Sequence, residues 1–204
     1  AYDPLDPRVI YAGTNSGMWK TTDGGATWSS PGFSGQQVTG IAVDPYDTQT
    51  VYVVADNGFY VSSDGGRTWE LVANLEPGLH NLLLVPTTPP LIYVYGWRGM
   101  MRSTDGGEHW ERPAGALAYA NIGSMATVVT WDRVTVYVGT AGGTAGGISA
   151  HIWDRQNDET PVAAGVYRYT TRRVWQAHLY LPLLLRGWIG TPQQVNRLST
   201  SPQR

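Results

Sequence analysis

Few side chains in this sequence combine the type and the spacing that chemistry requires, and Asp56 is the first of them. It follows the apolar run Val51–Ala55 and precedes Asn57. Its carboxylate could act as an acid or a base at the end of a strand, or it could cap a tight turn. Hydrolysis of a glycosidic bond needs two carboxylates that face one cleft, and no motif supports Asp132 or Asp154 as the second. The residues therefore favour the turn-capping role for Asp56.

Aromatic side chains next to polar ones form the second candidate chemistry. Trp97 is followed by Arg98, and Trp153 by Asp154. An aromatic ring beside hydrogen-bonding groups suits a sugar, which has apolar ring faces and a rim of hydroxyls. The alternative for Trp153 is that it packs on its own glycine-rich loop. The candidate ligand-binding residues are Asp56, Asn57, Trp97, Arg98, His151, Trp153 and Asp154.

Composition excludes several other classes of function. The chain has 204 residues, with 14 basic and 16 acidic side chains and a net charge of −2, so no field attracts nucleic acid. The absence of cysteine excludes disulfides, thiolate metal sites and cysteine nucleophiles. The four histidines lack metal-ligand spacing, and the glycine-rich run 139–147 lacks the Lys-Ser/Thr of a phosphate loop. We expect no metal, no cofactor and no membrane span.

A motif recurs at intervals of 41 residues, and it indicates which turns and strands position these side chains. Each copy has a Ser or Thr, an Asp two residues later, a pair of glycines and a Trp. Asp-Gly favours a tight turn because glycine adopts positive φ without steric cost, and the carboxylate and hydroxyl can accept bonds from turn amides. The motif therefore predicts a structural turn, built from Thr21, Asp23, Gly25, Thr27, Trp28, Ser62, Asp64, Gly66, Thr68, Trp69, Ser103, Asp105, Gly107 and Trp110.

Each unit is filled by short β-branched and aromatic runs, separated by Gly, Pro, Asn and Asp. This pattern predicts four antiparallel strands in about 41 residues, which is the size of one β-propeller blade. We expect an all-β propeller of about four blades, incomplete or a fragment of a longer one. The units lie near residues 1–38, 39–79, 80–122 and 123–185, followed by a polar tail at 186–204.

The fourth unit departs most from the repeat. Val136–Thr140 repeats Ile10–Thr14, but the expected turn Thr170–Trp175 keeps only the tryptophan of the motif. The distance from Trp110 to Trp175 is 65 residues, which exceeds the period by 24. We expect the excess to form an inserted loop at 141–164.

The motif Ser/Thr-x-Asp-x-Gly-x-Thr-Trp resembles the Asp-box, or bacterial neuraminidase repeat, of sialidases, xyloglucan-cleaving glycosidases, sortilin-type receptors and photosystem II assembly factors. The third copy has His109 in place of Thr. The resemblance implies a propeller in which the box is a fold element away from the functional site. Asp56 also resembles the catalytic aspartate that follows strand 2 in xyloglucan-cleaving hydrolases, but the double glycine of that family is missing.

Strand alternation separates the two ends of each blade. The Asp-box is the turn between strands 3 and 4, so the turns between strands 2 and 3 lie at the other end. We expect a non-catalytic scaffold, extracytoplasmic or secreted, that binds a glycan or a protein through its 2–3 loop face. The alternative is a glycoside hydrolase, xyloglucanase-like or sialidase-like, or a fragment of one. An open ring would expose sheet edges and favour self-association.

Overall fold

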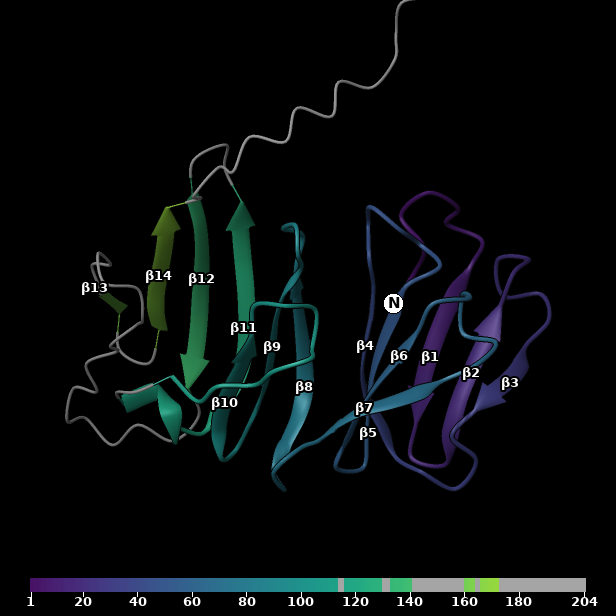
Figure 1. The fold of residues 1–204 in the computed structure, drawn as a ribbon, viewed down its shortest axis with the longest axis horizontal. Helices are drawn as coiled ribbons and strands as arrows, with labels where there is room; N and C mark the ends of the chain where they lie inside the picture. The colour runs from purple at the N-terminus through teal and green to yellow at the C-terminus, as the bar shows by residue number, and fades with distance from the viewer. Residues whose placement is uncertain (114–115, 130–132, 141–159, 164–165, 173–204) are drawn as a thin grey trace, which may run out of the picture. The chain divides into compact units, whose positions relative to one another are not determined.

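The computed structural model describes residues 1–113, 116–129, 133–140, 160–163 and 166–172, which form four antiparallel sheets (Figure 1). The first sheet has the order β1–β2–β3, at Ile10–Thr14, Gly17–Thr21 and Ser29–Gly32. Ala1 and Tyr2 run beside β1, because Tyr2 forms a bridge with Ile10 and the amide of Tyr11 donates to the Ala1 carbonyl. The all-β architecture predicted from the sequence is confirmed.

The second and third sheets repeat this arrangement. The second has the order β4–β5–β6–β7, at Val38–Val43, Val51–Ala55, Gly58–Ser62 and Glu70–Asn74. The third has β8, β9 and β10, at Leu79–Val85, Leu91–Gly96 and Gly99–Ser103. Its fourth strand is reduced to one bridge between Arg102 and Glu111, after which a short 3-10 helix, η1, spans Ala116–Ala118.

The fourth sheet has the order β11–β12–β14–β13, at Ile122–Val129, Arg133–Thr140, Val166–Arg172 and Thr160–Ala163. β13 lies within the range expected as an inserted loop, and the repeat pattern did not predict it. β14 continues through Arg172, across the first part of the expected turn at Thr170–Trp175. Threonine is β-branched and favours strands, and this segment lacks the Asp-Gly that would end one.

Consecutive sheets pack face to face through the alternating side chains of their second strands. Every residue of β5 is buried. Val51, Val53 and Ala55 pack against the first sheet, and Tyr52 and Val54 pack against the third. A strand covered on both faces reads as a continuous apolar run, which explains the sequence of β5.

The same alternation holds in β9. Ile92 and Val94 join the core with the second sheet, whereas Tyr93 and Tyr95 join the core with the fourth. The second and third sheets therefore each share one apolar core with the sheet before and another with the sheet after. Among the described residues, no helix has the length and hydrophobicity needed to cross a membrane.

Candidate functional site

The second Asp-box turn shows what the repeated motif does. The Ser62 hydroxyl donates to Asp64 Oδ1 at 2.8 Å and accepts from the Gly66 amide at 2.8 Å. Asp64 Oδ1 also accepts from the amides of Arg67 and Thr68, at 2.8 and 2.9 Å, and Oδ2 accepts from the Thr68 hydroxyl at 2.7 Å. Both carboxylate oxygens are thus used within their own turn.

The first and third turns repeat this network. Asp23 accepts from the Thr21 and Thr27 hydroxyls, at 2.7 and 2.6 Å. In the third turn the His109 ring replaces the threonine hydroxyl, with its Nδ1 2.7 Å from Asp105 Oδ2. The imidazole nitrogen therefore takes over the position of the hydroxyl oxygen.

These hydrogen bonds lower the pKa of all three carboxyl groups. The main cause is the Thr27 hydroxyl for Asp23, the Thr68 amide for Asp64 and the His109 amide for Asp105. A carboxylate with a lowered pKa that is held by its own turn is a poor general base. The box aspartates are therefore structural groups.

The box turns also tie neighbouring sheets together. The Gly65 carbonyl accepts from the Tyr11 hydroxyl at 2.9 Å and from Lys20 Nζ at 2.7 Å. Trp69 Nε1 donates to the Pro31 carbonyl at 3.2 Å, and the Trp69 ring lies edge-on to Phe33 with their centroids 5.1 Å apart. The second turn is thereby fastened to the first sheet.

One group of side chains in the described part of the chain could hold a metal ion. Asp105, Glu108 and His109 have ligand atoms within 4.8 Å of one another. The Asp105 carboxylate already accepts bonds from Ser103 and His109, and Glu108 and His109 are exposed. The group is a variant of the turn network, at the box end of the sheet.

Asp56 lies at the opposite end, in the two-residue turn between β5 and β6. It is exposed and has a positive φ of 49°. Its carboxylate accepts from the Gln37 amide at 3.0 Å, and its own amide donates to the Gln37 carbonyl at 2.9 Å. Asp56 therefore joins its turn to the start of β4. Asn57 joins the same turn to the end of β7, because its carbonyl accepts from the Leu75 amide at 2.6 Å.

Trp97 and Arg98 occupy the corresponding turn of the third sheet, between β9 and β10. Trp97 keeps 54% of its surface exposed, and the Arg98 guanidinium carbon is 5.2 Å from the centre of its ring. The indole lies against Gly78, where an added Cβ would come within 2.7 Å of a ring carbon. Trp97 is thus a half-exposed ring that lies against Gly78, with the Arg98 guanidinium over it.

Arg112 fixes the Trp97–Arg98 turn through its guanidinium group, a role that the sequence pattern did not predict. Its guanidinium donates to the Arg98 carbonyl at 3.1 Å, to the Ala118 carbonyl and to the Glu76 carboxylate at 2.5 Å. It also lies 4.6 Å from the centre of the Tyr119 ring. Arg112 does not belong to the repeated motif. Its contacts depend on the path of the chain past β10, which local spacing does not predict.

Other polar residues have smaller roles or lie outside the described residues. The Asn15 amide oxygen, in the β1–β2 turn, accepts from Gln37 Nε2 at 3.2 Å, which extends the network around Asp56. His80 belongs to β8. The predicted candidates His151, Trp153 and Asp154 lie outside the described residues, as does Asp132.

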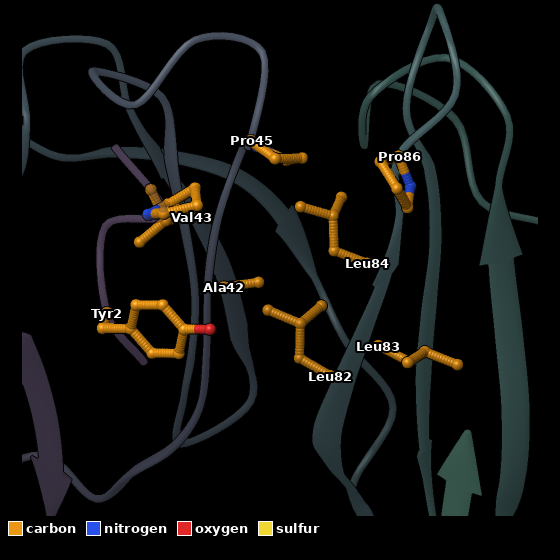
Figure 2. A pocket seen from close by; sticks show the side chains of 9 residues that line it. Tyr2, Ala42, Val43, Pro45, Leu82, Leu83, Leu84 and Pro86 are labelled. Carbon is orange, nitrogen blue, oxygen red and sulfur yellow. The ribbon is translucent and has the colours of Figure 1, made fainter. Parts of the chain in front are cut away.

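A pocket of about 330 Å³ opens between the inner strands β4 and β8 (Figure 2). Ala42 from β4 and Leu82 and Leu84 from β8 point into it, and Tyr2 lies at one side. Val43 and Leu83 also line it, but their side chains point to the other faces of their strands. Prolines complete the lining, so it lacks the acids and bases that hydrolysis requires. It is an apolar pocket between the second and third sheets.

Comparison with known proteins agrees with the turn geometry. The family model described as the BNR/Asp-box repeat matches residues 60–71, which span the end of β6, the second turn and the start of β7. The chain thus contains the Asp-box repeat and has a β-propeller fold. No curated protein matches it.

Solved structures similar to this chain include GH74 enzymes. An ancestral GH74 enzyme has 19% identity and a TM-score of 0.57, over 70% of this chain and 22% of the enzyme. The GH74 xyloglucanase from Xanthomonas campestris has 19% identity and a TM-score of 0.51, over 68% of this chain and 26% of the enzyme. YCF48 from Cyanidioschyzon merolae has 16% identity and a TM-score of 0.52, over 78% of this chain and 57% of YCF48. The chain thus spans about a quarter of the length of the two GH74 enzymes.

Proposed function

We propose that this Asp-box propeller is a non-catalytic module that binds a glycan at the end of the sheets opposite the box turns. The observation that carries the proposal is the exposed Trp97 ring, backed by Gly78 and flanked by Arg98. An indole offers a flat apolar surface to the C–H face of a pyranose ring, and the guanidinium can donate to hydroxyls at its rim. An extracytoplasmic or secreted location belongs to this proposal.

The setting of Asp56 supports binding without turnover. Its carboxylate accepts the Gln37 amide and sits on a turn with positive φ, so it positions backbone instead of reaching toward a substrate. Trp97 stands where the repeat places Asp56 one unit earlier, because the two positions are 41 residues apart. The third sheet therefore presents an aromatic surface where the second presents a structural carboxylate.

Titration calorimetry with xyloglucan oligosaccharides tests the proposal. We expect saturable binding by the wild-type chain and at least a tenfold weaker affinity for Trp97→Ala. Tyr46→Ala is the matched control, because Tyr46 is 69% exposed but lies in the connection at the opposite end of the second sheet. Equal affinity of wild type and Trp97→Ala would contradict the proposal.

The same oligosaccharides distinguish binding from hydrolysis. We expect no new reducing ends when wild-type protein is incubated with them. Cleavage that Asp56→Asn abolishes would replace the proposal with a glycoside hydrolase, the alternative that the fold of GH74 enzymes suggests. Absence of both binding and cleavage across a broad glycan array would leave a protein as the ligand and would overturn the glycan proposal.

A further inference from the structure

The two ends of the row of sheets expose side chains whose repeat equivalents are buried or partly buried. Trp28, Trp69 and Trp110 are equivalent by the 41-residue period. Trp69 packs on Phe33 of the preceding sheet, whereas Trp28 is 42% exposed and turns its Nε1 back to Gly25 of its own turn. The tryptophan of the first sheet thus lacks, among the described residues, the neighbour that the later one has.

The same difference recurs on β1 and β2. Val51 and Ile92 face the preceding sheet and have no exposed surface, but their equivalent Ile10 is only half-buried. Trp19 is 43% exposed, whereas its equivalent Tyr60 packs into the core shared with the first sheet. We call the surface of Ile10, Ala12, Trp19 and Trp28 the leading face.

The fourth sheet exposes the complementary positions. Tyr11, Tyr52 and Tyr93 each face the following sheet and are 2%, 4% and 1% exposed. Their equivalent Tyr137 is half-buried, and it pairs across the β11–β12 ladder with Ala126, which is exposed. Val128, on the same side of β11, is 51% exposed. We call the surface of Ala126, Val128 and Tyr137 the trailing face.

We propose that the trailing face of one chain docks on the leading face of a second copy of the same chain. The repeat itself defines what covers each face, because the contact between a trailing and a leading side already occurs between the first and second sheets. There Tyr11 and Met18 pack against Val51, Val53 and Tyr60. A net charge of −2 on 204 residues offers little repulsion to such an apolar contact.

The contact between copies is head-to-tail, because the two faces differ. Tyr11 donates its hydroxyl to the Gly65 carbonyl of the next turn at 2.9 Å. The equivalent bond between copies would run from Tyr137 to Gly24 of the second copy. Repeated head-to-tail contacts close a ring when the rotation allows it and otherwise form a filament.

Sedimentation across a series of protein concentrations tests this docking. We expect the wild-type chain to associate, and Trp19→Arg or Tyr137→Arg to weaken association at least tenfold. Trp28→Arg and Val128→Arg are second variants of the two faces, chosen because both side chains are largely exposed. Tyr46→Arg, outside both faces, should associate like wild type, and circular dichroism checks that every variant is folded.

Mixing the variants tests the polarity of the contact. Trp19→Arg keeps an intact trailing face and Tyr137→Arg an intact leading face, so an equimolar mixture should form dimers and nothing larger. A wild-type chain that stays monomeric at its highest soluble concentration would overturn the proposal. A mixture that stays monomeric while wild type associates would also overturn it, since the mixture still contains an intact trailing face and an intact leading face that should join. Glycan binding at Trp97 is expected to be the same in all these variants.

Discussion

At the scale of single residues, each box turn depends on a buried hydroxyl. Ser62 is 1% exposed and accepts from the amide of Gly66, which is also buried. We expect Ser62→Ala to lower the free energy of unfolding by about 1–3 kcal/mol, because it leaves a buried N–H without its acceptor. Urea unfolding measures this. Ser63→Ala is the matched control. Because the Ser63 side chain is exposed, its loss should change the free energy of unfolding by no more than about 0.5 kcal/mol.

The box carboxylates predict how stability depends on pH. The pKa of Asp23, Asp64 and Asp105 is lower in the folded protein than in the unfolded chain. Their contribution is therefore complete above the ordinary carboxyl pKa of about 3.9 and is lost as pH falls through the folded-state values. We expect the melting temperature to fall below roughly pH 4 and the fall to be smaller in Asp64→Asn. An equal acid dependence in wild type and Asp64→Asn would contradict this.

At the scale of elements, one large side chain packs between the second and third sheets. Phe59 on β6 is fully buried and packs against Trp110, with ring centroids 4.9 Å apart. Gly107 approaches it so closely that an added Cβ would lie 2.4 Å from the ring, and its φ of +106° also favours glycine.

Removing the Phe59 side chain should weaken the contact between the second and third sheets. We expect Phe59→Ala to reduce the free energy of unfolding by about 3–5 kcal/mol, because it leaves a cavity between the second and third sheets. Leu71→Ala on β7 is the control, since Leu71 is 47% exposed and its loss should cost about 1 kcal/mol or less. Equal losses in guanidinium unfolding would mean that Phe59 does not carry the interface.

At the scale of the whole molecule, equivalent residues contribute differently to the free energy of unfolding, according to their place in the row of sheets. We expect Trp69→Ala to cost about 3 kcal/mol, because it removes packing on Phe33 and the bond to Pro31. Trp28→Ala should cost about 1 kcal/mol or less in dilute solution, where its face is uncovered. Thermal unfolding at low protein concentration compares the two, and equal losses would show that Trp28 has a covered environment in the isolated chain.

The sequence by itself determined the strands, the turns and their period, because these depend on local preferences. Asp-Gly-Gly requires positive φ wherever it occurs, and a run such as Val51–Ala55 must be covered on both faces. It also indicated Asp56 and Trp97 as equivalent turn positions.

Only the tertiary structure decided what those positions do. It showed that Asp56 binds the Gln37 amide, that Trp97 lies on Gly78 and that Arg112 joins Arg98 to Glu76. These contacts join residues far apart in the chain, so no local spacing encodes them. β13 is likewise a non-local result, because a strand at the edge of β14 depends on an available partner more than on its own sequence.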